Sequence, residues 1–191
     1  MNRIARFLAL LLLAACGSSQ APPPDMNDAC AIARDRRGWM RDMERTERKW
    51  GVPVAVQMST IYHESKFVAD ARTPMTYALG IIPMGRRSSA YGFAQAIDGT
   101  WDWYQDSTGN RRAKRDRFSD ASDFIGWYMD RTQKTNGVPK WDARNQYLAY
   151  HEGHTGYARG TWHNKAWLLR TADSVASRAA MYDQQLQGCR R

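Results

Sequence analysis

Residues 54–67 read VAVQMSTIYHESKF and predict the central helix of the chain. Because the first eight of these residues are mostly apolar or small, we expect a largely buried helix that starts just after Pro53. The helix would carry Glu64 near its end, between the apolar residue Ile61 and the aromatic residue Phe67. A carboxyl group in dry surroundings keeps its proton to a higher pH than a solvated one, as a general acid must. The plainer interpretation is a solvated glutamate at a helix end.

The rest of the chain also predicts helices, with no strand-rich region and no internal repeat. Helical patterns recur in further segments, at residues 28–50, 119–131, 141–151 and 162–187, and the aromatic run at 100–104 also predicts a helix. Residues 70–90 place several Pro, Gly and Ser between a few apolar residues, which indicates a long loop or a small irregular subdomain beside Glu64. Residues 109–118 are strongly basic and predict a solvated loop. The expected fold class is therefore mainly α.

Three short motifs follow one another along the chain. They are Glu64-Ser65, then Gly-Phe-Ala-Gln at residues 92–95, then Ala-Tyr-His at residues 149–151. Thr100 lies five residues after the glutamine, and Gly153 follows the third motif. This order resembles the SLT domain of lytic transglycosylases in the goose-lysozyme-like group, over about residues 50–160. The resemblance implies a lysozyme-like helical domain that acts on peptidoglycan.

The same resemblance implies a role for particular side chains. Glu64 would be the catalytic residue, and the substrate-binding residues would be Ser65, Tyr91, Gln95, Tyr150 and His151. The chain also departs from the family pattern. His151 stands where the family has the Asn that is thought to hold the sugar's N-acetyl group, and Phe93 and Ala94 replace Leu and Met. The gap between the first two motifs is longer than usual, so we expect a divergent subfamily.

The implied reaction uses one carboxyl group of the protein. Glu64 would protonate the oxygen between MurNAc and GlcNAc, while the N-acetyl carbonyl of MurNAc stabilises the cationic centre. Glu64 would then take the proton of the 6-hydroxyl group of the same sugar, which closes on C1 and leaves a 1,6-anhydro end. An intramolecular nucleophile has a large entropic advantage, so the cleft need only orient the sugar ring.

Two other functions fit the same motifs. A lysozyme-type muramidase would use a second acid to position water, and Asp98 or Glu152 is the candidate, with Asp102 also near the motifs. A non-catalytic peptidoglycan-binding lipoprotein would keep the cleft without turnover, an alternative supported only by the departure at His151. The masses of the products distinguish a muramidase from a lytic transglycosylase, because a hydrolase adds one water molecule.

The N-terminus has the features of an export signal. Arg3 and Arg6 precede an apolar run at residues 7–13, which is too short to span a bilayer stably. Small residues then lead directly to Cys16, in a pattern that resembles the bacterial lipoprotein signal. We therefore expect a signal peptide at 1–15, a lipidated tether at 16–27 and one domain at 28–191. Gly17 favours the outer membrane, with the domain facing the periplasm.

The chain is basic, with a formal net charge of +9. Cleavage before Cys16 would remove two Arg and leave about +7. A basic exported protein has polyanionic partners, so peptidoglycan glycan strands, anionic lipid and lipopolysaccharide are the candidates. Nucleic acid is not expected, because no nucleic-acid motif is present. The sequence does not identify a protein partner in the envelope.

The other two cysteines form an even pair. If Cys16 carries lipid, Cys30 and Cys189 remain near the two ends of the domain, in an oxidising compartment. We expect a disulfide between them, and closing so long a loop stabilises the fold by about 5 kcal/mol in the chain-entropy model.

Two short stretches hint at metal ligands, His63-Glu64 and residues 151–154 (His-Glu-Gly-His). Neither has the helical His-Glu-x-x-His spacing of a zinc site, and Gly153 would interrupt the helix that such a site needs. We therefore expect no metal and no cofactor.

Overall fold

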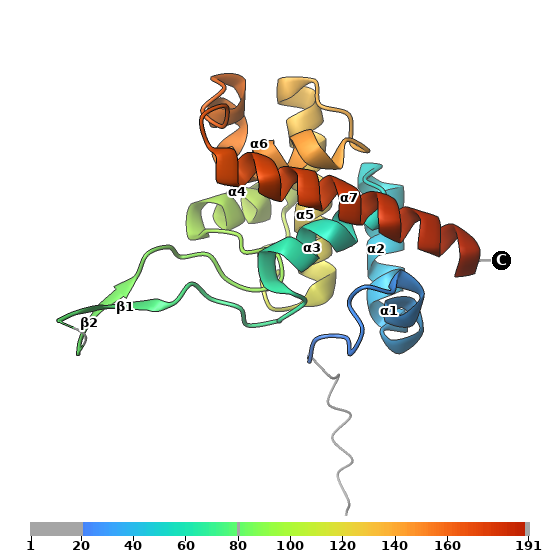
Figure 1. Cartoon of the computed structure of the whole chain (residues 1–191), viewed down its shortest axis with the longest axis horizontal. Helices are drawn as coiled ribbons and strands as arrows, with labels where there is room; N and C mark the ends of the chain where they lie inside the picture. Colours follow the sequence, from blue (N-terminus) through green and yellow to red (C-terminus); the bar gives the residue numbers. More distant parts are fainter. Residues whose placement is uncertain (1–20, 80, 190–191) are drawn as a thin grey trace, which may run out of the picture.

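The computed structural model describes residues 21–79 and 81–189 (Figure 1). The predicted signal peptide at 1–15 and the predicted lipidation site Cys16 lie outside the described residues. The mainly α-helical fold class is confirmed. The elements are the helices α1 (Ala29–Asp35), α2 (Arg37–Trp50), α3 (Val54–Ser65), α4 (Asp98–Thr108), α5 (Phe118–Asn136), α6 (Ala143–Ala158) and α7 (Ala166–Cys189), and the strands β1 (Met75–Ala78) and β2 (Ile82–Arg86).

Helix α3 is the buried centre of the fold, as predicted. Every residue from Val54 to Ile61 is buried, and the helix packs against α2, α5 and α7. Figure 1 shows α7 crossing the molecule next to α3. The polar side chains of α3 are satisfied inside the protein. The Gln57 amide donates to the carbonyls of Met43 (3.1 Å) and Val52 (2.8 Å), and the Ser59 hydroxyl donates to the carbonyl of Val175 (2.7 Å). Buried polar groups with partners carry no large desolvation cost.

The prediction of one helix over 28–50 is wrong in one respect, because the segment forms two helices. Asp28 caps α1, and its carboxylate accepts hydrogen bonds from the backbone N–H groups of Cys30 (2.8 Å) and Ala31 (3.0 Å). At Arg36 the backbone leaves the helical region, with φ −119° and ψ 54°. This break lets α1 turn onto α7 while α2 packs along α5.

Within residues 70–90, for which the sequence predicted a long loop or a small irregular subdomain, residues 75–86 form a β-hairpin. Strands β1 and β2 pair antiparallel, from Met75 opposite Arg86 to Ala78 opposite Ile82, with a bulge between Thr76 and Tyr77. In Figure 1 the hairpin extends away from the helices. It is joined to them by the segments that lead to the cavity described below.

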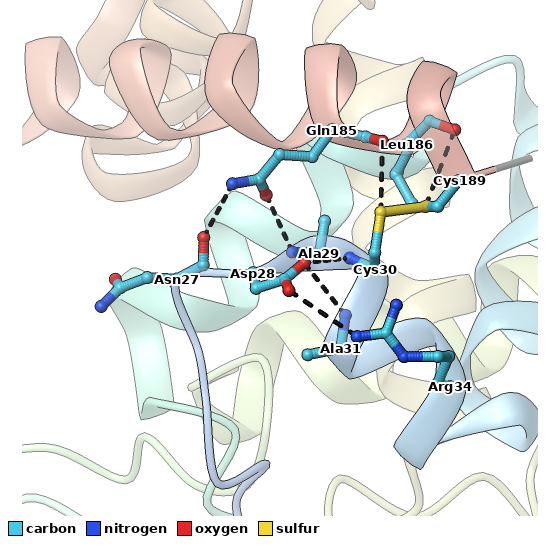
Figure 2. Close-up of a disulfide and its surroundings, with 9 residues drawn as sticks. All are labelled: Asn27, Asp28, Ala29, Cys30, Ala31, Arg34, Gln185, Leu186 and Cys189. Atoms are coloured by element: carbon cyan, nitrogen blue, oxygen red, sulfur yellow. Dashed lines mark hydrogen bonds and ion pairs between the residues drawn. A yellow bond between two sulfur atoms is a disulfide. The ribbon is translucent and has the colours of Figure 1, made fainter.

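The disulfide between Cys30 and Cys189 is confirmed, with Cα atoms 5.9 Å apart. Figure 2 shows that it links α1 to the end of α7. Beside it, the Gln185 side chain accepts a hydrogen bond from the N–H of Ala29 (2.8 Å) and donates to the carbonyl of Asn27 (3.0 Å). The two ends of the domain are therefore held together by one covalent bond and by hydrogen bonds.

The last residues of the predicted tether pack on the domain. The carbonyl of Met26 accepts hydrogen bonds from the Arg178 guanidinium (3.2 Å) and from the Tyr182 hydroxyl. The side chain of Pro23 is buried. Among residues 21–79 and 81–189, no helix is both long enough and apolar enough to cross a bilayer.

Candidate active site

The end of α3 places Glu64 at the wall of a cavity. Two residues directly after the helix, Lys66 and Phe67, have positive φ angles of 52° and 59°, so the chain turns away sharply. Phe67 is fully buried and stacks on Trp39 with ring centroids 5.9 Å apart, which anchors the turn. Glu64 is left beside a cavity of about 500 Å³.

The cavity brings together several residues that the sequence singled out. Glu64, Gln95, Tyr150 and His151 all line it, although they come from three different segments of the chain. Hollows of similar volume occur elsewhere, such as one of about 520 Å³ beside Trp162. Volume alone therefore does not identify the site, and the chemistry of Glu64 does.

Glu64 is surrounded closely by protein and still opens onto the cavity, since part of the residue is exposed. Burial raises the pKa of its carboxyl group to about 7, and a hydrogen bond from the Tyr147 hydroxyl opposes part of this rise. Burial, together with the nearby Glu64 charge, also raises the pKa of Tyr147. The tyrosine thus stays protonated and donates to a carboxyl group that can gain or lose a proton near neutral pH.

Tyr150 connects the cavity wall to the second motif. Its hydroxyl donates to the carbonyl of Ala94 (2.6 Å), and burial raises the pKa of this hydroxyl, as does the charge of Glu64. Gln95 holds the same turn, because its amide donates to the carbonyls of Gly92 (2.8 Å) and Ala71 (2.9 Å). Hydrogen bonds from Tyr150 and from Gln95 therefore hold the turn in place beside the cavity.

Gly92 is required by this turn. Its φ is +80°, and a Cβ atom there would lie 2.1 Å from the carbonyl oxygen of Arg115. Any side chain would push the turn away from Arg115. Position 92 must therefore be glycine for steric reasons.

His151 replaces the family's Asn and has a fixed hydrogen-bond partner. Its Nδ1 lies 3.0 Å from Oε1 of Glu152, whose oxygens also accept from Nζ of Lys165 at 2.7 and 2.8 Å and from the Thr161 hydroxyl. Although burial alone raises the pKa of Glu152, the hydrogen bonds from Lys165, Thr161 and His151 lower it to about 2. A carboxylate can only accept, so Nδ1 of His151 carries a proton and donates it to Glu152.

The two other predicted substrate-binding residues are not among those that line the cavity. Ser65 is buried, and its hydroxyl donates to the carbonyl of Ile61 (3.2 Å), one turn earlier in α3. The Tyr91 hydroxyl donates to Asp116 (3.1 Å), and the Arg72 guanidinium lies 4.1 Å from its ring centroid. Both residues lie next to lining residues in the sequence and support the surrounding structure.

Sequence reasoning missed Tyr147, the side chain that contacts Glu64. A signal was present, because Tyr147 lies three residues before Tyr150 and four before His151, on one face of a helix. It also missed Thr73 and Ser88, which line the cavity from the base of the hairpin. Nothing in the sequence of that segment indicated which of its residues would face Glu64.

The candidates for a second acid are differently placed. Asp98 forms an ion pair with Arg115 (2.8 Å) and its side chain is 64% exposed, and Asp102 is exposed on α4. Neither is among the residues that line the cavity, whereas Glu152 is. Glu152 thus shares the cavity with Glu64, but its oxygens are occupied by three donors.

The histidines near the motifs are engaged in hydrogen bonds within the protein. Nδ1 of His63 lies 2.9 Å from the carbonyl of Ser59, its Nε2 lies 3.1 Å from the Ser174 hydroxyl, and Nε2 of His154 lies 3.1 Å from the Thr132 hydroxyl. In the part of the chain that the structure describes, no group of three His, Cys, Asp or Glu side chains could hold a metal ion.

Comparison with known proteins identifies the family of the chain. The family model described as the transglycosylase SLT domain matches residues 4–189, which is nearly the whole chain. A sequence search finds no match among curated proteins. The match includes the helix that carries Glu64, the turn at 92–95 and the helix that carries Tyr150. The chain therefore belongs to the transglycosylase SLT domain family.

Proposed function

We propose that this protein is a peptidoglycan lytic transglycosylase in which Glu64 is the single acid and base. The observation that carries the proposal is a glutamic acid with a pKa of about 7 in the wall of a cavity of about 500 Å³, within an SLT domain. A general acid works best when its pKa lies near the working pH. Glu64 meets that requirement because of burial.

The first step is protonation of the glycosidic oxygen between MurNAc and GlcNAc by Glu64. The bond from C1 of MurNAc to that oxygen breaks, GlcNAc leaves with the proton, and the N-acetyl carbonyl of MurNAc stabilises C1. Glu64 is left as a carboxylate, and the hydroxyl of Tyr147 stabilises its charge by a hydrogen bond. That hydrogen bond is worth more after proton transfer than before it, so it favours the transition state.

In the second step the Glu64 carboxylate removes the proton from the 6-hydroxyl group of the same MurNAc. The oxygen closes on C1, and the product is a 1,6-anhydroMurNAc end. Glu64 regains its proton and no water is consumed. Because the nucleophile belongs to the substrate, the protein contributes orientation, and Gln95, Tyr150 and His151 line the space in which the sugar would lie.

The state of Glu152 favours this mechanism over hydrolysis. A two-carboxylate glycosidase needs a second acidic group that is free to activate water or to attack C1. Glu152 lines the cavity, yet Lys165, Thr161 and His151 occupy its oxygens and hold its pKa at about 2. A carboxylate held in this way is a weak base, so the hydroxyl group of the substrate is the better nucleophile.

The experiment is digestion of purified peptidoglycan sacculi, with the products analysed by mass spectrometry. We expect muropeptides that are one water molecule lighter than those released by a muramidase. The variant Glu64→Gln should lose activity by about 10²- to 10⁴-fold while keeping its fold. Asp98→Asn and Asp102→Asn are matched controls, since both remove a carboxylate outside the cavity, and both should keep wild-type activity.

Other outcomes would identify a different function. Products that carry the extra water molecule indicate a muramidase. Binding to sacculi without any released product indicates a wall-binding protein. Full activity of the Glu64→Gln variant would falsify the assignment of Glu64.

We also propose that the protein is anchored by lipid at Cys16 to the outer membrane and faces the periplasm. The support is the charged, apolar and small-residue order of residues 1–16. Labelling of cells with radioactive palmitate tests this. The wild-type chain should take up label, and the Cys16→Ser variant should not.

A further inference from the structure

The tip of the β1–β2 hairpin exposes large apolar side chains. Leu79, Ile81 and Met84 are 90%, 78% and 67% exposed. Leu79 and Ile81 belong to the turn between the two strands and Met84 lies in β2, in a hairpin that extends away from the helices (Figure 1). Of the hairpin side chains that the structure describes, none belongs to the hydrophobic core. Clustered apolar side chains of this size on a protruding tip mark an interaction surface.

The base of the hairpin is positively charged. Residues 71–97 contain three Arg and neither Asp nor Glu. All three, Arg72, Arg86 and Arg87, are exposed. Two of them are held in place, because the Arg72 guanidinium lies over the ring of Tyr91 and that of Arg86 donates to the carbonyl of Thr73. The hairpin thus exposes apolar side chains toward its tip and arginines where it joins the domain.

We propose that the hairpin tip inserts into the interfacial region of an anionic phospholipid bilayer, with the arginines at its base contacting the headgroup phosphates. Transfer of apolar side chains out of water favours insertion, and basic residues near an anionic surface add to it. Insertion would be shallow, since the edges of a two-stranded hairpin carry unpaired backbone groups that cannot enter hydrocarbon.

A bilayer fits this surface better than a protein partner does. A stable protein interface buries about 1,200–2,000 Å² in total. Strands of four and five residues offer a narrow tip with few side chains, so a flat partner would cover little area. Lipid surrounds an inserted tip from all sides and can bury all of its apolar surface.

Contact through the tip would also position the cavity relative to the membrane. Thr73 and Ser88, at the two ends of the hairpin, line the cavity with Glu64, and the Thr73 hydroxyl donates to the carbonyl of Ser88 (3.0 Å). A hairpin fixed at its tip would therefore set the orientation of the cavity above the lipid surface. This inference does not depend on the reaction proposed for Glu64.

The experiment places an environment-sensitive fluorophore at the tip of the full chain. The variant carries Cys16→Ser and Leu79→Cys, so residue 79 is the only free thiol, because Cys30 and Cys189 are joined. The probe is a lipid vesicle with about 30% phosphatidylglycerol, compared with one of phosphatidylcholine alone. A matched control carries the same label at Gln133, an exposed position in α5.

We expect a blue shift and quenching by brominated lipid at residue 79 on anionic vesicles, and neither at residue 133. The lipid concentration for half-maximal signal should rise by about tenfold when Arg86 and Arg87 are both changed to Gln. Leu79 is almost fully exposed, so its substitution removes no packing. Unchanged far-ultraviolet circular dichroism checks the fold.

Three results would overturn the proposal. The first is a label at residue 79 that stays in water on anionic vesicles. The second is an equal signal on neutral vesicles, because the arginines would then contribute nothing. The third is a blue shift without lipid that grows with protein concentration, because a second copy of the chain would then cover the tip.

Discussion

Glu64 and Glu152 lie in the wall of the same cavity, yet their pKa values move in opposite directions. Burial raises the pKa of both groups; it dominates at Glu64, whereas at Glu152 the surrounding hydrogen-bond donors outweigh it. Glu64 has one neutral donor, the Tyr147 hydroxyl, and its pKa rises to about 7. Glu152 has Lys165, Thr161 and His151, and its pKa falls to about 2. The comparison shows that the number and charge of nearby donors influence whether a carboxyl group in this cavity can exchange a proton near neutral pH or stays ionised.

The strongest way to break this comparison is to change each acid to Gln and measure stability by urea unfolding. For Glu152, the folded pKa of about 2 lies below the ordinary value of 4.5, so its ionised form stabilises the fold above pH 4.5. Since its side chain is only 4% exposed, Glu152→Gln should lower the free energy of unfolding at pH 8 by about 1–3 kcal/mol.

For Glu64 the sign is reversed. Its folded pKa of about 7 lies above 4.5, so stability falls as the pH rises from 4.5 to 7. Glu64→Gln should therefore raise the free energy of unfolding at pH 8 by about 1–3 kcal/mol, while we expect it to lose activity. If both variants shift stability in the same direction, the contrast between the two acids is wrong.

The dependence of the initial rate on pH gives a second test. Glu64 has to start protonated, so the rate should fall about tenfold per pH unit above pH 7. Glu152 stays ionised well below this range and should not contribute to the fall. The measurement is the initial rate of sacculus digestion from pH 5 to about 9. A flat profile up to pH 9 would contradict the role of Glu64 as the acid.

The smallest expected effect concerns the Tyr147 hydroxyl, which donates a hydrogen bond to Glu64. Tyr147→Phe removes the hydrogen bond that lowers the pKa of Glu64, so this pKa should rise further. The alkaline limb of the rate profile should move up by about 0.5–1 pH unit, with a rate loss below about tenfold at pH 6. Tyr157→Phe is the matched control, since that hydroxyl donates to Asn145 (3.2 Å) outside the cavity wall. A shift of equal size in both variants would remove Tyr147 from the site.

Local patterns in the sequence predicted much of the fold. The apolar run before Glu64 predicted α3, and the even pair of cysteines predicted the disulfide. Such features depend on a few neighbouring residues or on simple chemistry. The break at Arg36 and the hairpin at 75–86 were not predicted, because each depends on what the segment packs against or pairs with.

The same division runs through the candidate site. The motifs identified Glu64, Gln95, Tyr150 and His151, which meet in one cavity, because each motif is a short local signal. They also pointed to Ser65 and Tyr91, whose side chains make contacts outside the cavity lining. Sequence position could not reveal this, since one step along a helix turns the side-chain direction by about 100°.

The sequence by itself determined that a helical domain would present an acid at the end of a buried helix, because apolar periodicity and motif order depend only on the order of the residues. Only the tertiary structure decided what that acid can do. Tyr147 reaches Glu64 from α6, and Lys165 neutralises Glu152 from a turn thirteen residues further along the chain. A pKa depends on the groups within a few ångströms in space, and folding alone brings those groups together.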